Sequence, residues 1–160
     1  MAYHDDLIQQ ALMLVHKEPR KPKQASLRRA VSTAYYALFH LLIDASVANW
    51  KTAKLRHGLA RSFEHTHMKE ASKRFQQPNA PQYTGQSAPV VTTLRDIATT
   101  FVQLQEKRHI ADYDNATFWT RTEALLHVAQ VQKAFQLWET IRDEPLAQEY
   151  LLALLAKKRT

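Results

Sequence analysis

The 160-residue sequence contains no cysteine, only two glycines and only six prolines. The lack of cysteine excludes disulfide scaffolds and cysteine-ligated zinc sites, and it fits a reducing compartment. So few glycines leave little material for tight hairpins, which favours a mostly helical fold. Acidic residues are also in the minority, because 15 Asp and Glu face 22 Lys and Arg, a formal net charge of +7. Such a surface attracts polyanions. Charge alone is equally compatible with an ordinary basic protein that binds none.

Several chemical signatures are missing as well. The two glycines, Gly58 and Gly85, stand apart, so there is no glycine-rich phosphate loop, and no two histidines lie four residues apart. We therefore expect no cofactor and no metal site. The start "MAYHDDLIQQ" does not resemble a signal peptide and no apolar run is long enough to span a bilayer, so we expect a cytoplasmic protein without a membrane partner. The tryptophans are expected in the core or at its rim: Trp50, Trp119 and Trp138.

Apolar residues recur every three or four positions through most of the chain, which is the period of helices buried on one side. The spacing predicts helices over about residues 2–17, 25–50, 55–75, 90–108, 116–143 and 146–158. The uncharged segment "QQPNAPQYTGQSAP" (76–89) predicts a long loop, of a kind that is often functional or mobile. With no internal repeat, we expect a single domain over residues 1–160. Its fold is predicted as an all-α, up-and-down four-helix bundle core (about 25–143) with additional N- and C-terminal helices.

The helix predicted over 25–50 carries a polar stripe as regular as its apolar one. Its members fall within about 60° of one another on a helical wheel: Arg29, Thr33, Tyr36 and His40. A solvated face accounts for the first two, whereas rings with polar tips favour places that are dry on one side. Two interpretations stay open: the rings bond to a neighbouring helix at the bundle edge, or they line a functional cleft or interface.

A second signal lies at the end of the helix predicted over 90–108. The spacing of Leu94, Ala98 and Phe101 places Arg108 on the inward face of this helix. A buried guanidinium needs acceptors, because an unpaired buried charge is strongly destabilising. Asp112 and Asp114 follow closely and are candidates to supply them. A structural ion pair and a functional arginine are both compatible with this pattern.

Three stretches, "LRRAVSTAYYALFHLL", "RHGLARSF" and "KRHIADYDN", together resemble the HEPN family (higher eukaryotes and prokaryotes nucleotide-binding domain), in its small prokaryotic branch with an RxxADY-type motif. The resemblance extends from about residue 25 to residue 140. Three motifs in the right order are more specific than any one of them. The residues that carry it are Arg28 or Arg29, Ala34, Tyr35, Tyr36, Ala37, Phe39, His40, His57, Arg108, Ala111, Asp112 and Tyr113.

The resemblance implies a bundle of four core helices that is often dimeric. Members of the family include RNA-cleaving toxins, nucleotide-binding modules and partners of nucleotidyltransferases in toxin–antitoxin pairs and other defence systems. The family's ribonucleases need no metal and depend on an arginine separated from a histidine by four to six residues. Here the candidate positions after Arg108 hold Tyr113, Asp114 and Asn115, so that pair is not intact.

Three hypotheses follow. The first is a HEPN-like module that forms a homodimer, binds a partner protein of the nucleotidyltransferase type and contacts RNA or a nucleotide. The second is a metal-independent, toxin-like endoribonuclease that uses Arg108, with His40 or His57 as a displaced proton-transfer residue. The third is a structural bundle without a ligand. The candidate binding or interface residues are Arg29, Thr33, Tyr36, His40, His57, Arg108, Asp112 and Tyr113.

Overall fold

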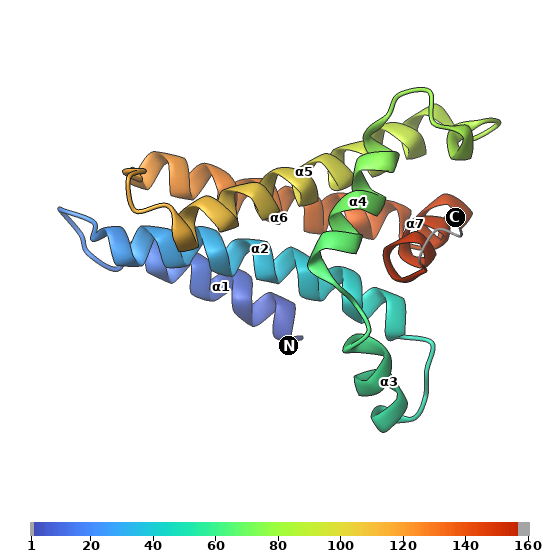
Figure 1. Cartoon of the computed structure of the whole chain (residues 1–160), viewed down its shortest axis with the longest axis horizontal. Coiled ribbons are helices and arrows are strands. Elements are labelled where there is room, and N and C mark those ends of the chain that lie inside the picture. The colour runs from blue at the N-terminus through green and yellow to red at the C-terminus, as the bar shows by residue number, and fades with distance from the viewer. Residues whose placement is uncertain (1, 157–160) are drawn as a thin grey trace.

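The computed structural model describes residues 2–156 of the chain. This part contains seven α-helices and one short 3₁₀ helix, joined by loops. The prediction of an all-α helical bundle is confirmed (Figure 1). The elements are α1 (Tyr3–Val15), α2 (Gln24–Val47), α3 (Ala53–Ala60), α4 (His65–Gln76), η1 (Pro81–Tyr83), α5 (Ala88–Tyr113), α6 (Arg121–Ile141) and α7 (Pro145–Leu155).

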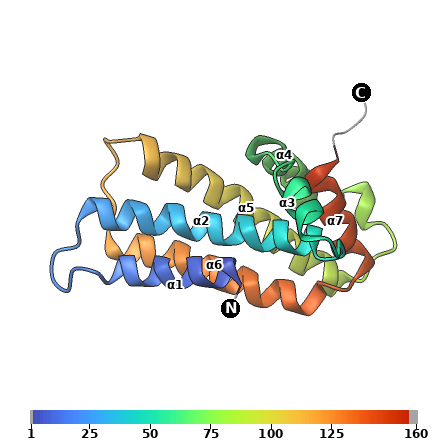
Figure 2. The same ribbon diagram turned by 90° about the horizontal axis from the view of Figure 1, so that it is seen from below.

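Four long helices form an up-and-down bundle, in which α1, α2, α5 and α6 run in alternating directions (Figures 1 and 2). Helix α2 lies in the middle and packs against the other three. Its alanines Ala30, Ala34 and Ala37 are fully buried, and side chains this small let neighbouring helices approach closely. Helix α1 therefore belongs to the bundle itself, which means that the core begins before residue 25.

Helix α2 is long and apolar enough to cross a membrane by length and composition, which the sequence reading did not anticipate. However, 72% of its most apolar stretch is buried within the protein. The core helix of a bundle passes the same test, because it is covered by apolar neighbours on most sides. Its apolar surface is thus used by α1, α5 and α6.

The structure corrects several predicted helix boundaries, and two of these corrections concern site residues. The helix expected over 55–75 is two helices, α3 and α4, separated by a short break at residues 61–64. The helix expected to end at Arg108 continues as α5 to Tyr113, so the "HIADY" segment is helical and not a break. Nothing in that segment opposes a helix, because it contains neither glycine nor proline. Consequently Arg108 and Asp112 lie one turn apart on the same helix face.

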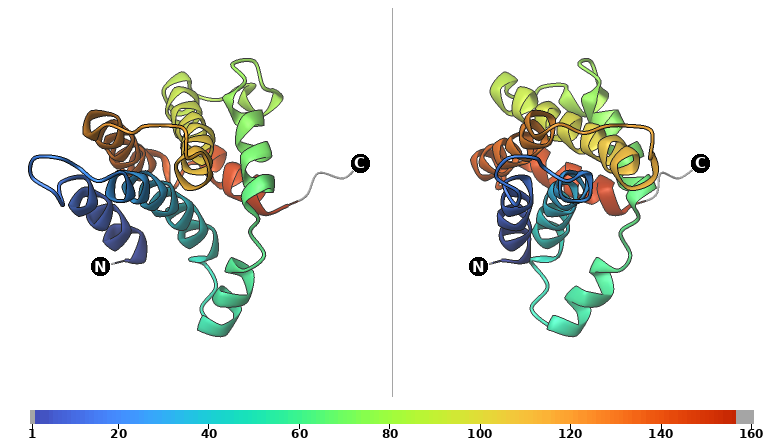
Figure 3. Two further views of the ribbon diagram at one scale, coloured as in Figure 1. Left: turned by 60° about the vertical axis from the view of Figure 1, so that its left-hand side comes forward. Right: turned by 90° about the vertical axis from the view of Figure 1, so that its left-hand side faces the viewer.

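The remaining helices lie at one end of the bundle. Helix α4 packs against α5 and α7, and a hydrogen bond of 2.7 Å joins the buried hydroxyls of Ser72 and Tyr150 across the α4–α7 contact. Burial raises the pKa of the Tyr150 phenol, so this hydroxyl stays neutral. Helix α3 instead extends away from the bundle (Figure 3). This arrangement brings the start of α4 beside the middle of α2 and the end of α5.

Candidate functional site at the junction of α2, α4 and α5

The Arg108 side chain is the centre of a polar and aromatic cluster. It projects from the penultimate turn of α5 toward α2, and only 13% of it is exposed. Its guanidinium carbon lies 5.2 Å from the ring centre of Tyr35 and 5.7 Å from that of Tyr36. A guanidinium within about 6 Å of an aromatic ring is attracted by the electrons of its face. Two neighbouring tyrosines of α2 therefore hold this one cation.

The hydrogen bonding of Arg108 is incomplete. Its nearest carboxylate is Asp112, at 3.8 Å, which is an ion pair too long for a hydrogen bond. The Asp112 carboxylate also accepts a hydrogen bond of 3.3 Å from Ser32. The Arg108 Nε atom is buried without a partner among the described residues, and so is the Gln105 side-chain oxygen one turn earlier. Buried polar atoms in this state are places where a ligand or an ordered water gains by binding.

His65, the first residue of α4, completes the cluster. Its Nδ1 lies 2.6 Å from the fully buried Tyr35 hydroxyl, and its ring stacks on Phe39 with 4.2 Å between ring centres. Burial, followed by the charge of Arg108, lowers the pKa of the imidazole below its usual value. Burial also raises the pKa of the Tyr35 phenol, a shift that the charge of Arg108 opposes. At neutral pH the cluster thus contains a neutral imidazole, a neutral phenol and one fixed cation.

An open groove lies beside the cluster, between the first half of α2 and the last turn of α5. It has a volume of about 440 Å³, and Tyr36 forms part of its wall. Arg29 is exposed at its edge, and the Tyr113 ring, 68% exposed, stands opposite. The other lining residues are Ala25, Arg28, Ser32, Ala111 and Asp112.

The two adjacent arginines of the groove differ in their partners. Arg28 donates to the carbonyl oxygens of Ala111 at 3.0 Å, Asp114 at 2.7 Å and Thr117 at 2.5 Å. It is therefore occupied with holding the end of α5 and the following loop. Asp114, which the sequence offered as a partner for Arg108, accepts from the backbone N–H of Ala116 instead. Arg29 is the cation of this groove that faces solvent.

A second recess of about 460 Å³ lies between α4 and α5. Arg108, Gln105 and His109 line it, and Lys69 forms an ion pair of 3.3 Å with Glu106 at its wall. Arg108 lines this recess, and it also contacts Tyr36 and Asp112, which line the groove. Both hollows contain cationic side chains and polar atoms, as a site for a phosphate-bearing ligand requires.

The structure brings together five of the predicted site residues: Arg29, Tyr36, Arg108, Asp112 and Tyr113. Thr33 does not join them at the surface, because it is buried in the bundle. His40 turns its ring toward α1, where it packs at 4.8 Å on Tyr3. His57 lines a different hollow, at the start of α1, together with His4 and Asp44.

Sequence reasoning missed His65 as a site residue and treated Tyr35 only as a motif residue. His65 opens a helix whose start was not predicted, because α3 and α4 were read as one element. Tyr35 lies on the buried side of α2, outside the polar stripe, where a phenol is ordinarily core packing. The double tyrosine "YY" was the available signal. Adjacent helix positions point in different directions, so a tyrosine next to Tyr36 of the polar stripe had to face a neighbouring helix.

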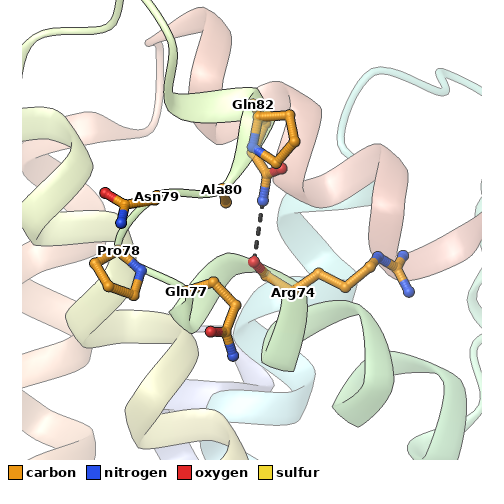
Figure 4. Close-up of a pocket in the computed structure, with 7 residues that line it drawn as sticks. Arg74, Gln77, Pro78, Asn79, Ala80 and Gln82 are labelled. Atoms are coloured by element: carbon orange, nitrogen blue, oxygen red, sulfur yellow. Dashed lines mark hydrogen bonds between the residues drawn. The ribbon is translucent and has the colours of Figure 1, made fainter.

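Neither a metal-binding group nor the hollow beside the loop after α4 adds chemistry to the site. Within residues 2–156 no group of three or more histidine, aspartate or glutamate side chains is placed to hold a metal. The loop after α4 encloses a hollow of about 610 Å³ (Figure 4), where the Gln82 amide donates to the Arg74 carbonyl oxygen at 3.1 Å. Figure 4 shows the Arg74 guanidinium extending away from Pro78 and Asn79. This hollow contains no acid and no histidine.

Comparisons with known proteins identify no relative. No family model, no curated protein and no solved structure matches this chain.

Proposed function

We propose that this chain is a HEPN-like module that binds single-stranded RNA or a nucleotide in the groove between α2 and α5, and that it acts as a dimer with a partner protein of the nucleotidyltransferase type. The observation that carries the proposal is the grouping of Arg29, Tyr36 and Tyr113 around one open hollow. A solvent-facing cation suits a phosphate, and exposed aromatic rings suit a base.

The charges of the groove favour a ligand with both a phosphate and a base. Arg29 attracts the phosphate, whereas the Asp112 carboxylate repels it and suits the N–H donors of a base, among them the N3–H of uracil. Tyr113 offers a ring face at the rim, and its contact with His109, 5.0 Å between ring centres, extends the aromatic surface. A simple anion would gain little from this pattern.

Binding of a labelled uridine-rich oligonucleotide at low salt tests the groove. Arg29→Gln and Tyr113→Ala should each weaken binding about tenfold, since one phosphate contact or one stacked base is lost. Lys133→Gln on α6 removes an exposed cation elsewhere and serves as the matched control. Equal affinities for all three variants, with unchanged helical circular dichroism, would place RNA binding outside the groove.

The dimer and partner contact is supported by exposed aromatic side chains beside the groove. Phe118 is 75% exposed in the loop that follows α5, close in sequence to Tyr113. Aromatic residues are enriched at the centres of protein interfaces. Sedimentation of the wild type over a range of concentrations should show self-association that Phe118→Ser weakens. A monomer at every concentration would contradict the dimer.

A second candidate function, RNA cleavage, is favoured by the cluster of His65, Tyr35 and Arg108. The nucleophile is the 2′-hydroxyl of RNA, which attacks the neighbouring phosphorus and forms a 2′,3′-cyclic phosphate. With the phenol accepting from Nδ1–H, the His65 Nε2 takes the 2′-hydroxyl proton. The bond to the 5′-oxygen breaks, that oxygen takes a proton from water, and Arg108 stabilises the charge on the phosphorus oxygens. In this version His65 replaces the proton-transfer histidines considered from the sequence.

Incubation of the protein with RNA in the presence of a chelator tests this second function. Cleavage should occur and should be abolished by Arg108→Met and by His65→Gln, with the helical circular-dichroism signal retained. His57→Gln is the control, because His57 lies in a different hollow. Absence of cleavage by the wild type would eliminate the endoribonuclease and leave binding as the function.

A further inference from the structure

Residues 48–62, which contain α3, form an arm that the bundle covers only where Leu59 and Ala60 pack against its core. None of the eight residues of α3 is buried, and the helix extends away from the other helices (Figure 3). Val47 and Phe63, both buried, anchor its two ends. An isolated helix of this length is marginal in water. The arm therefore has a surface that a ligand can cover without displacing any part of the bundle.

The arm carries charge of one sign. Between Ala45 and Phe63 the sequence has no aspartate or glutamate, and its cations are Lys51, Lys54, Arg56 and Arg61. All of these except Arg56 are exposed. Such a run attracts polyanions and repels a second copy of itself.

An exposed tryptophan stands among these cations. Trp50 is 51% exposed, contrary to the expectation of core or rim packing, whereas Trp119 and Trp138 are 4% and 2% exposed. The Arg56 guanidinium donates to the carbonyl oxygens of Trp50 at 2.7 Å and Lys51 at 2.8 Å. These bonds attach the loop to α3, so that the indole and the lysines are presented as one unit.

We propose that the α3 arm is a second contact for single-stranded RNA, with Trp50 stacking on a base and Lys51, Lys54 and Arg61 binding phosphates. This inference rests on RNA being the ligand of the proposed function, but it concerns a different surface. Aromatic rings interleaved with cations are the common means of binding single strands without sequence preference. An apolar protein partner or a bilayer would need a wider apolar face than Trp50 and Leu55 provide.

Tryptophan fluorescence tests the arm directly, because Trp50 is the exposed indole of the chain. Addition of a uridine-rich oligonucleotide of about 12 nucleotides should quench the emission of the wild type but not that of Trp50→Phe. The double variant Lys51→Gln and Lys54→Gln should bind several-fold more weakly and reduce the magnitude of the slope of log affinity against log salt by about 1.4. Lys133→Gln should match the wild type.

The outcomes separate the arm from the groove. Quenching that persists in Arg29→Gln and Tyr113→Ala without loss of affinity supports the arm and contradicts the groove. Loss of affinity in those two variants, with no change in Trp50 emission on RNA addition, overturns the arm and leaves the groove. A blue shift of Trp50 with vesicles of anionic lipid, without quenching by RNA, would make the arm a membrane contact and overturn the inference.

Discussion

The Tyr35 hydroxyl and the His65 Nδ1, 2.6 Å apart, join the middle of α2 to the start of α4. The contact is set between the stacked Phe39 ring on one side and the Arg108 guanidinium on the other. A buried phenol without a partner would be destabilising, so this bond fixes the direction in which α4 leaves the break after α3. This hydrogen bond therefore stabilises the contact between α2 and α4, whichever ligand the neighbouring groove binds.

We expect Tyr35→Phe to lower the free energy of unfolding by about 1–2 kcal/mol, because it removes this buried hydrogen bond and leaves the imidazole unpartnered. Urea denaturation followed by circular dichroism measures the loss. Tyr3→Phe is the control, because Tyr3 is 59% exposed and contacts His40 through its ring. Similar losses for both variants would mean that the Tyr35–His65 bond contributes nothing specific.

Stability should fall on mild acidification. Burial is the largest cause that lowers the pKa of His40, His65 and His127 from the usual 6.5. Below pH 6.5 the unfolded chain binds protons that the folded protein does not, so the free energy of unfolding decreases as the pH falls toward the folded pKa values. Above pH 6.5, the pKa of histidine in the unfolded chain, the three imidazoles contribute their full stabilisation.

Unfolding at about pH 5.5 and about pH 7.5 measures this effect. The difference should be smaller in His65→Gln, which removes one of the three groups. The lowered pKa values of Glu18 and Asp114, due mainly to hydrogen bonds from Lys23 and Thr117, act below their usual 4.5 and 3.8 and outside this range. Equal stability at the two pH values would show that these histidines titrate normally.

The adjacent arginines Arg28 and Arg29 should respond differently to truncation. Arg28→Ala removes hydrogen bonds to three carbonyl oxygens and should cost about 2 kcal/mol. Arg29→Ala, at an exposed position, should change stability by less than ~0.5 kcal/mol. Thermal or urea unfolding of the two variants provides the comparison. A larger loss for Arg29→Ala would contradict the partners assigned to them.

Helix α6 begins with a capping box, whose contribution to stability can be compared with that of an N-cap serine that makes no such bond. The Thr120 side chain accepts from the Glu123 N–H at 3.1 Å, and the Glu123 carboxylate accepts from the Thr120 N–H at 3.3 Å. Thr120→Ala should cost about 1 kcal/mol. Ser87, at the start of α5, makes no such bond, so Ser87→Ala should cost less than ~0.5 kcal/mol. Urea midpoints that shift equally would disprove the cap.

The long helices were predictable because their signal is local. The apolar period of α2, α5 and α6 repeats through about six to seven turns, and burial of that stripe is what stabilises them. The ends were less predictable. Residues 116–120 were read as helix although Thr120 is the cap of α6, and 109–113 were read as a break although α5 runs through them. Ends are decided by single hydrogen bonds, which leave little trace in a periodic pattern.

The grouping of Arg29, Tyr36 and Tyr113 in one groove was only partly predictable. A helical wheel gives the angular positions of side chains on α2, but it cannot say which neighbour covers each face. Helix α1 covers His40, and helix α4 places His65 beside Tyr35 instead. His65 was therefore missed, because the start of α4 was not predicted.

The order of residues determined by itself that this chain is helical, basic and free of thiol chemistry, since composition and periodicity follow directly from it. The tertiary structure decided which histidine lies beside Arg108, which arginine stays open to a ligand, and that one short helix is left largely exposed. The physical reason is that these properties depend on contacts between helices distant in the chain, and desolvation and charge–ring contacts arise only once those helices pack.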